Sequence, residues 1–250
     1  MTIGGEQVWE SSLPSLHRLR HRPALVDRIA WLENIAMRKS VIHLGFLDVG
    51  RAQDKEASGT WLHERLSRVT TRLVGIDLDP TGVAAAVDAG YEAYACDLEE
   101  PGAVERLRLE PAELVVAGEL IEHLDRPGPF LDAVKPLVAA GGRLVLTTPN
   151  ATSMTNVVVA LSRREWTSAS HVAMYSWRTF ATLLDRHDWR LQEVIFYYRG
   201  RRAGPEARLR PVLAAAFNAY ERAVRPLLRF CPTIADGLIV VAERHRQDGT

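Results

Sequence analysis

Short apolar runs alternate with helical segments along most of this chain, and that alternation restricts the fold more than any other feature of the sequence. The runs occupy residues 41–44, 72–77, 91–96, 114–117, 143–148, 194–198 and 238–242. Continuous apolar strands separated by helices are typical of a parallel sheet that is buried on both faces and joined by right-handed crossovers. The pattern predicts a doubly wound α/β fold around a mostly parallel, seven-stranded sheet.

Helical periodicity lies between these runs and on both sides of them. We expect helices at 61–69, 81–89, 128–139 and 177–187, the third of them ended by Gly141 and Gly142. Apolar residues at helical spacing between residues 13 and 37 predict a helical N-terminal arm, with Pro23 where a helix can begin. The arginine-rich stretch 206–229 predicts a helical insertion between the last two strands.

A single domain in four parts is the organisation we expect. These parts are the arm over 1–39, a core over 40–198, the insertion over 199–235, and the final strand and tail over 236–250. Segments that follow the later strands of such a sheet emerge on its ligand side. The insertion is therefore predicted to lie over the active site.

Charge and cysteine content exclude several classes of protein. Basic and acidic side chains balance at 31 each, so no overall field attracts nucleic acid or an anionic membrane. No window is long and apolar enough to span a membrane, and residues 1–12 lack the pattern of a signal peptide. Cys96 and Cys231 are too few for a disulfide framework. We expect a cytoplasmic monomer or homodimer that does not bind nucleic acid.

The residues that follow each strand are the candidates for function, because ligands of open α/β sheets bind at the carboxyl ends of the strands. Gly45 follows the first run, Asp77 ends the second, and Asp97 follows the third. Residues 118–124, Gly-Glu-Leu-Ile-Glu-His-Leu, follow the fourth run, and residues 147–150, Thr-Thr-Pro-Asn, end the fifth.

Taken in order, these signals resemble the class I S-adenosylmethionine-dependent methyltransferases, in particular a small-molecule group with a Gly-Glu-hydrophobic-hydrophobic-Glu-His-Leu segment followed by Thr-Thr-Pro-Asn. The resemblance covers residues 40–198. It implies a Rossmann-like fold that binds S-adenosylmethionine and releases S-adenosylhomocysteine.

The resemblance also implies roles for individual residues. Asp77 would bind the ribose hydroxyls, Asp97 the adenine amino group and Leu98 the face of the ring. Gly118 would pass close to the sulfonium, and the turn at Gly45 would hold the methionine end together with the next helix N-terminus, where free N–H groups suit a carboxylate. The implied cofactor-binding residues are Leu44, Gly45, Phe46, His63, Asp77, Leu78, Asp97, Leu98, Gly118 and Glu119.

The first motif departs from the family pattern. An acidic residue two positions before the glycine and a Gly-x-Gly repeat are usual, whereas His43 takes the acidic position and Phe46 follows Gly45. A second alignment places Gly50 at the turn, and Gly45 is preferred because it directly ends the apolar run. A carboxylate at the position of Asp77 also binds the ribose in nicotinamide-dependent dehydrogenases. No Gly-x-Gly-x-x-Gly motif follows the first strand, however, which argues against a dehydrogenase.

Methyl transfer requires alignment of acceptor and methyl group and a base that accepts one proton. The catalytic candidates are Glu119, Glu122, His123 and His171. Imidazole has an ordinary pKa near neutrality, and on a helical turn Glu119 would share a side with Glu122 or His123. By resemblance to metal-dependent O-methyltransferases, the same four residues also suit a divalent cation. We predict a reaction that needs no metal, and the metal-assisted reaction stays open.

The sequence thus predicts a methyltransferase that acts on an oxygen or nitrogen atom of a small metabolite, in bacterial secondary metabolism. A cofactor-binding protein without turnover is the alternative. The arginines of the insertion leave two interpretations: a solvated helix face, or a lid that gathers an anionic acceptor through the fork geometry of guanidinium.

Overall fold

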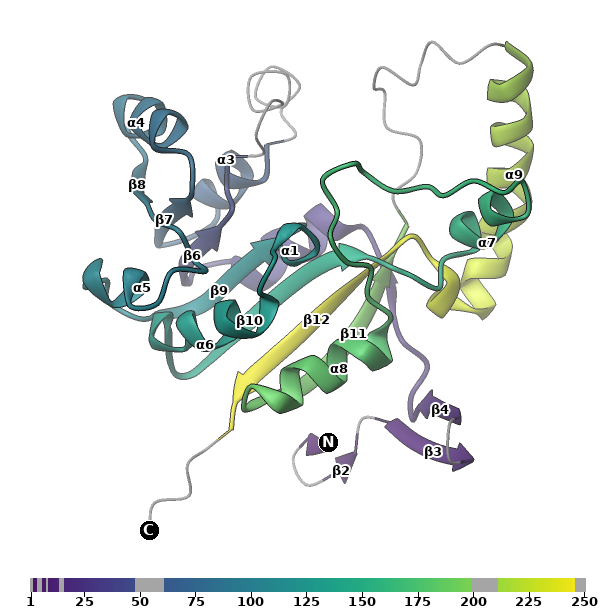
Figure 1. The fold of residues 1–250 in the computed structure, drawn as a ribbon, viewed down its shortest axis with the longest axis horizontal. Helices are drawn as coiled ribbons and strands as arrows, with labels where there is room; N and C mark the ends of the chain where they lie inside the picture. The colour runs from purple at the N-terminus through teal and green to yellow at the C-terminus, as the bar shows by residue number, and fades with distance from the viewer. Residues whose placement is uncertain are drawn as a thin grey trace.

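A central sheet with helices on both faces organises the molecule (Figure 1). The computed structural model describes residues 2–3, 6–7, 9–13, 16–47, 61–198 and 211–245. The sheet has eight strands in the order β5-β11-β12-β10-β9-β6-β7-β8. Their bounds are β5 Leu25–Val26, β6 Ser40–Leu44, β7 Arg72–Asp77, β8 Glu92–Ala95, β9 Ala112–Gly118, β10 Val138–Pro149, β11 Trp189–Tyr197 and β12 Gly237–Arg244.

Strand direction confirms the mostly parallel, doubly wound sheet. Strands β10, β9, β6, β7 and β8 run parallel to one another, and only β12 runs antiparallel, to β10 on one side and to β11 on the other. The expected number of seven strands is wrong. The eighth is the two-residue strand β5, which pairs in parallel with the edge strand β11.

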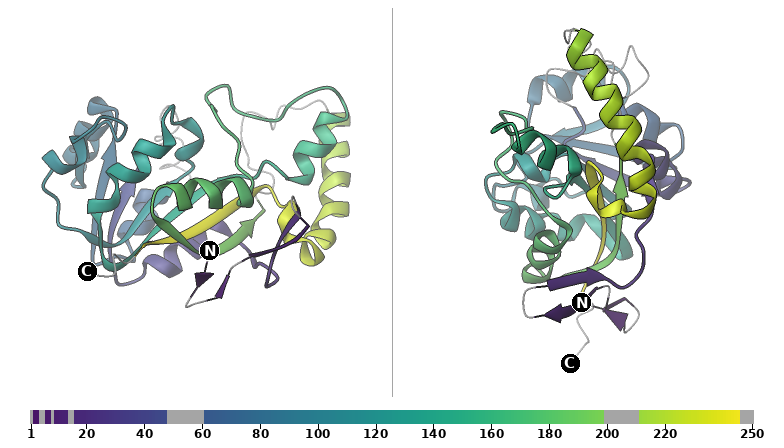
Figure 2. Two further views of the ribbon diagram at one scale, coloured as in Figure 1. Left: turned by 60° about the horizontal axis from the view of Figure 1, so that its bottom comes forward. Right: turned by 90° about the vertical axis from the view of Figure 1, so that its right-hand side faces the viewer.

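Side chains alternate between the two faces of the sheet, as period-two geometry requires. On one face Val41, Leu114 and Val145 pack with α1 (Arg28–Ala36) and α3 (Leu62–Ser67). On the other face Ile42, Val115 and Leu146 pack with α5 (Ala103–Arg106), α6 (Pro127–Ala133) and α8 (Trp177–Arg186). Figure 2 shows these two helical layers from the side. Helix α4 (Pro80–Asp88) connects β7 to β8.

The prediction of a helical N-terminal arm is wrong over most of the arm's length. The described residues before β5 form two small antiparallel pairs, β1 (Thr2–Ile3) with β2 (Glu6–Gln7) and β3 (Trp9–Leu13) with β4 (Leu16–Leu19). The helix begins only at Arg28, after Asp27, whose carboxylate accepts a hydrogen bond from the amide of Ala30 at 2.8 Å. Just before it, the carbonyl of Ala24 accepts from the amide of Phe196 at 2.9 Å. Pairing with the sheet edge overrides the local helical pattern.

The helix expected at 128–139 is also wrong in its second half. Helix α6 ends at Ala133, a short 3-10 turn η2 follows at Lys135–Leu137, and β10 already begins at Val138. Pro136 lies in that turn, and proline lacks the amide and clashes with the preceding turn of an α-helix. Gly141 therefore does not end a helix. It lies in β10 with φ +75°, where the pairing register with β9 shifts.

Two helices project together beyond the sheet, at the right of Figure 1. They are α7 (Met154–Ala160) and α9 (Pro211–Phe230), joined by a hydrogen bond of 3.0 Å between the hydroxyls of Thr155 and Tyr220. The 3-10 turn η4 (Pro232–Ile234) leads from α9 into β12. Residues 199–210 of the expected insertion lie outside the described residues. Among the described helices, none has the length and apolar character needed to cross a membrane.

Candidate active site

Two glycines lie side by side at the point where the order of the strands reverses. Leu44 of β6 pairs with Ala117 of β9, so Gly45 and Gly118 continue the two strands at one carboxyl edge. Gly45 has φ +64°, and a Cβ there would lie 2.9 Å from the side chain of Leu120. A Cβ on Gly118 would lie 2.9 Å from the guanidinium of Arg28. Glycine at both positions leaves the backbone accessible to a ligand.

Asp77 ends the neighbouring strand β7 with its carboxylate fixed. One oxygen accepts from the amide of Leu47 at 2.9 Å and the other accepts from the amide of Asp79 at 3.3 Å. The residue is 7% exposed. Each carboxylate oxygen has lone pairs in addition to those used here, so the group retains capacity for a pair of ribose hydroxyls.

The remaining residues expected around the adenosine differ in exposure. Leu98 is buried and Leu78 is 67% exposed. Asp97 is exposed, and its carboxylate accepts from the amide of Glu99 at 2.8 Å. The strand order brings Gly45, Asp77 and Asp97 to the ends of neighbouring strands. The alternative turn at Gly50 lies outside the described residues.

His63 is buried near the N-terminus of α3, against His43 from β6. Their Nδ1 atoms are 3.2 Å apart, so one ring donates a hydrogen bond to the other. Burial lowers the pKa of His43 to about 3, helped by the charge of Arg28. Burial also lowers the pKa of His63 to about 2, helped by His43. Both rings are therefore neutral at physiological pH, and Phe46, whose ring centroid lies 4.5 Å from that of His63, packs beside them.

Arg28 is a candidate that sequence reasoning missed. Its Nε donates to the hydroxyl of Thr147 at 3.0 Å, and its guanidinium lies 6.0 Å from the centroid of the Tyr197 ring. The side chain thus reaches from the first residue of α1 to the ends of β9 and β10. A cation at a helix N-terminus opposes the helix dipole. That unfavourable position is the one local signal that marks Arg28 for a function.

The side chain of Glu119 points toward Tyr197, which is not the orientation that we expected from a helical turn. Its φ of +56° places it in the left-handed region, and the 3-10 turn η1 (Ile121–His123) begins only two residues later. The expected helical turn through Glu119 is therefore not formed. Its carboxylate accepts hydrogen bonds from the hydroxyls of Tyr197 and Thr147. Sequence reasoning missed Tyr197 because it comes from the distant strand β11.

Glu122, His123 and His171 form a cluster beside this edge. Each offers one ligand atom, and these atoms all lie within 4.8 Å of one another. The backbone keeps the cluster together, because the carbonyl of Glu122 accepts from the amide of Val172 at 2.8 Å. The two imidazole rings meet edge to face at 4.7 Å. Of the four residues proposed for catalysis or metal binding, the structure therefore brings three together, and Glu119 belongs to the neighbouring Tyr197 contact.

Burial decides the protonation of this cluster. It raises the pKa of the Glu122 carboxyl to about 7, and neither carboxylate oxygen has a hydrogen-bond partner among the described residues. Burial and the neighbouring His123 lower the pKa of His171. A carboxyl that is half protonated near neutrality beside a neutral imidazole suits proton transfer. An orphaned buried carboxylate beside two imidazoles equally suits a divalent cation.

Comparisons with known proteins agree with this architecture. The family described as a methyltransferase domain matches residues 16–194. A ubiquinone biosynthesis O-methyltransferase of Xylella fastidiosa (strain M23) is 32% identical over 124 residues, which are 48% of this chain and 48% of that protein. The mitochondrial ubiquinone biosynthesis O-methyltransferase of Homo sapiens is 26% identical over 186 residues, 71% of this chain and 48% of that protein. The chain thus spans about half the length of the curated relatives it matches.

Solved structures share the fold at low identity. A methyltransferase of Haloferax volcanii, solved with the activator Trm112, gives a TM-score of 0.55 at 12% identity and covers 89% of this chain and 90% of its own. The N-methyltransferase NodS of Bradyrhizobium japonicum, in complex with S-adenosylhomocysteine, gives 0.50 at 17% identity and covers 88% and 85%.

Proposed function

This chain belongs to the methyltransferase domain family and is therefore a methyltransferase, and we propose that it transfers the methyl group of S-adenosylmethionine to an oxygen or nitrogen atom of a small metabolite. The observation that carries the proposal is the position of Gly45, Asp77 and Gly118 at the ends of adjacent strands, beside the Glu122 cluster. The names of the bacterial and human relatives favour an oxygen acceptor.

In this proposal the residues near the strand ends each bind a different part of the cofactor. Asp77 binds the two ribose hydroxyls, and Asp97 and Leu98 contact the adenine. Arg28 binds the carboxylate of the methionine end, since guanidinium matches a carboxylate with two parallel hydrogen bonds. Gly118 lets the sulfonium approach the backbone. When bound, the sulfonium supplies an electrophilic methyl carbon.

The cluster provides the base. As the acceptor oxygen forms its bond to the methyl carbon and the carbon–sulfur bond breaks, the hydroxyl proton must leave. His171 accepts that proton at Nε2, because its lowered pKa keeps the ring neutral beforehand. Glu122 lies within reach to compensate the charge that forms on the imidazole. His123 completes the group and holds His171 by ring contact.

Calorimetric titration with S-adenosylhomocysteine tests the cofactor site. Asp77→Asn keeps an oxygen that accepts from Leu47 but removes the charge, and we expect the affinity to fall about 10- to 150-fold, the equivalent of about 1.5–3 kcal/mol. Asp88→Asn is the matched control, because Asp88 is exposed at the end of α4. Unchanged affinity in Asp77→Asn would show that the ribose lies elsewhere.

Methylthioadenosine separates the role of Arg28 from that of Asp77, because this nucleoside lacks the carboxylate. Arg28→Gln should weaken the binding of S-adenosylhomocysteine and leave the binding of methylthioadenosine unchanged. Asp77→Asn should weaken the binding of both ligands. Equal losses for both ligands in Arg28→Gln would contradict carboxylate binding and indicate a general disturbance of the sheet edge.

Metal-assisted O-methyl transfer is the second candidate, favoured by the 4.8 Å grouping of Glu122, His123 and His171. A divalent cation would lower the pKa of the acceptor hydroxyl. We propose the metal-independent reaction, in which activity survives dialysis against EDTA. Equilibrium dialysis with Mn²⁺ decides between the two: saturable binding that is lost in both Glu122→Gln and His171→Asn would establish the metal-assisted reaction.

We propose that three segments of the chain select the acceptor. These are residues 151–176 after β10, the insertion over 199–235 and the N-terminal arm over 1–39. The guanidinium of Arg225 lies 5.6 Å from the centroid of the Tyr198 ring. This contact connects α9 with the end of β11. The core over 40–198, together with Arg28 of the arm, then supplies the cofactor site, and the core alone supplies the base.

A further inference from the structure

Thr147, the first threonine of the Thr-Thr-Pro-Asn segment, lies beside the glycine edge of the sheet. In β10 it pairs with Gly118 of β9 on one side and with Ile239 of β12 on the other. The residue is completely buried. Because a buried hydroxyl in a folded protein keeps hydrogen-bond partners, the groups that Thr147 contacts show what its side chain does.

Three hydrogen bonds use the whole capacity of this hydroxyl. It accepts from Nε of Arg28 at 3.0 Å and from the amide of Glu119 at 3.2 Å, and it donates to the Glu119 carboxylate at 3.3 Å. A hydroxyl has one proton to donate and two lone pairs that accept. Each of them has a partner here, so the rotation of the hydroxyl is fixed, and so is the direction in which it holds Nε of Arg28.

This contact determines which nitrogens of Arg28 can meet a ligand. Thr147 occupies Nε, whereas Nη2 lies 2.9 Å from the place that a Cβ on Gly118 would take. The two Nη nitrogens of a guanidinium offer parallel N–H groups that match the two oxygens of a carboxylate. The guanidinium carbon also lies 6.0 Å from the centroid of the Tyr197 ring, within the range of a cation–π contact. Thr147 and Tyr197 therefore hold Arg28 with its terminal nitrogens at the glycine edge.

The same hydroxyl lies between two opposite charges. Arg28 and Glu119 both contact Thr147, yet among the ion pairs of the described residues none joins these two side chains. The Glu119 carboxylate accepts instead from the hydroxyl of Tyr197. The left-handed backbone of Glu119 is fixed by its amide, which donates to the Thr147 carbonyl at 2.8 Å as well as to the hydroxyl. A direct pair with Glu119 would compete with a ligand carboxylate for the guanidinium.

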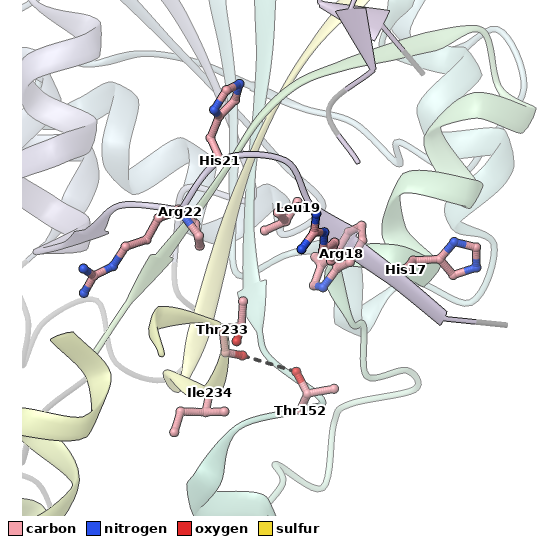
Figure 3. A pocket seen from close by; sticks show the side chains of 10 residues that line it. His17, Arg18, Leu19, His21, Arg22, Thr152, Thr233 and Ile234 are labelled. Atoms are coloured by element: carbon pink, nitrogen blue, oxygen red, sulfur yellow. Dashed lines mark hydrogen bonds between the residues drawn. The ribbon is translucent and has the colours of Figure 1, made fainter. Parts of the chain in front are cut away.

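The end of the strand that carries Thr147 is fixed by Asn150. The side-chain amide of Asn150 donates to the carbonyls of Thr233 at 2.9 Å and Ala235 at 2.8 Å, and its carbonyl oxygen accepts from the amide of Thr152 at 3.1 Å. The hydroxyl of Thr152 donates to the Thr233 carbonyl at 3.4 Å, which is the dashed line in Figure 3. We therefore expect β10 to keep its position when the side chain of Thr147 is changed.

We propose that Thr147 is a positioning residue for Arg28: its hydroxyl directs the guanidinium to the glycine edge and keeps it apart from Glu119, so that the guanidinium is available to the carboxylate at the methionine end of the cofactor. This role rests on the proposed function, in which Arg28 binds that carboxylate. It gives the Thr-Thr-Pro-Asn segment a part in cofactor binding that acts through another residue.

Calorimetric titration of Thr147→Val with S-adenosylhomocysteine and methylthioadenosine tests this role. Valine keeps the shape of the side chain and removes the hydroxyl. We expect the affinity for S-adenosylhomocysteine to fall about tenfold, as for the loss of one hydrogen bond to a charged group. The affinity for methylthioadenosine should stay unchanged, because that nucleoside lacks the carboxylate. Equal losses for the two ligands, or wild-type affinity for both, would overturn the role.

Thr147→Ser and Thr148→Val are the matched controls. Serine keeps the hydroxyl, so Thr147→Ser should bind S-adenosylhomocysteine as the wild type does. Thr148 is equally buried and, as the next residue of the strand, points to the opposite face of the sheet, so Thr148→Val should also bind normally. Thermal unfolding of each variant verifies that it is folded. A loss in either control as large as that in Thr147→Val would show a general disturbance of β10 and overturn the specific role of the hydroxyl.

Removal of the Glu119 charge tests the separation of the two charges. Glutamine does not pair with a guanidinium as a carboxylate does, so Thr147→Val/Glu119→Gln should recover part of the S-adenosylhomocysteine affinity that Thr147→Val loses. Glu119→Gln alone keeps an oxygen that accepts from Thr147 and Tyr197, and it serves as the reference for the double variant. A double variant that binds as weakly as Thr147→Val would contradict the separation.

The same titrations distinguish this role from the proposed function. Wild-type protein that does not bind S-adenosylhomocysteine would refute both. If S-adenosylhomocysteine binds and Arg28→Gln weakens it selectively, the proposed function stands. Insensitivity to Thr147→Val in that case would refute the role of Thr147 alone.

Discussion

The buried histidine pair predicts a steep loss of stability in mild acid. His43 and His63 are 2% and 0% exposed, with ring centroids 5.4 Å apart. A proton on either ring would place a charge in a packed cluster of aromatic side chains, which includes Phe46, Trp61 and Tyr91. Burial, the largest cause, lowers the pKa of His43 to about 3 and that of His63 to about 2. The folded protein therefore binds no proton here above about pH 4.

The unfolded chain behaves differently, since its histidines titrate near an ordinary pKa of about 6.5. Below that pH the unfolded state binds more protons than the folded state, so the free energy of unfolding falls as pH falls. For one histidine the loss at pH 5 relative to pH 8 is RT ln(1 + 10^1.5), or about 2 kcal/mol. For His43 and His63 together it is about 4 kcal/mol, which is a large part of the roughly 5–15 kcal/mol that stabilises a domain.

Urea unfolding of wild type and of His43→Gln/His63→Gln at pH 8 and pH 5 measures this term. The double variant keeps polar side chains of similar size without titrating, and it retains every other pH-dependent group of the wild type. We expect the wild type to lose about 4 kcal/mol more than the variant between the two pH values. Parallel losses in the two proteins would refute the reasoning, because the pair would then be protonated in the folded state or accessible to water.

Three further predictions concern single positions. The pKa of Glu122 is raised to about 7, so the folded state holds the carboxyl proton more tightly than the unfolded state does. As pH rises from 5 to 8 in EDTA, the free energy of unfolding of the wild type should fall by about 2–3 kcal/mol more than that of Glu122→Gln. Urea unfolding at both pH values would show this difference. Gly237→Ala places a Cβ 2.0 Å from the Tyr197 ring and should cost about 1–3 kcal/mol by overpacking; thermal unfolding should show partial recovery in the double variant with Tyr197→Leu. Asp27→Ala removes the N-cap of α1 and should cost about 1 kcal/mol of stability, with weaker S-adenosylhomocysteine binding measured by calorimetry because Arg28 is then less well positioned.

Local sequence patterns predicted seven of the eight strands of the central sheet, because β6, β7, β9, β10, β11 and β12 each contain a largely apolar run that is buried in the sheet. They also predicted the strand-end positions of Gly45, Asp77 and Gly118, since these follow from where the runs end. The local patterns failed where contacts with residues far away in the sequence determine the conformation. Leu25 fits a helical stripe in sequence but pairs with Phe196 at the edge of the sheet. Pro136, in the turn after α6, is a local signal against the long helix.

Side-chain orientation at the site was beyond local reasoning for a related reason. The left-handed backbone of Glu119 turns its carboxylate toward Tyr197, and nothing within a few residues of Glu119 requires that conformation. Tyr197 in turn lies where it does because Gly237 of the next strand has no side chain. A contact that depends on three segments so far apart in sequence is visible only once the strands are assembled.

The replacement of the usual acidic residue by His43 bears directly on the role of Arg28. An aspartate or glutamate at the end of β6 would lie near the guanidinium and compete for it. His43 stays neutral because it is buried and because the Arg28 charge itself disfavours a second cation. Among the described residues, Arg28 hydrogen-bonds only the neutral hydroxyl of Thr147. The uncharged histidine thus leaves the positive charge of Arg28 directed at the glycine edge, where the carboxylate of a bound cofactor would meet it.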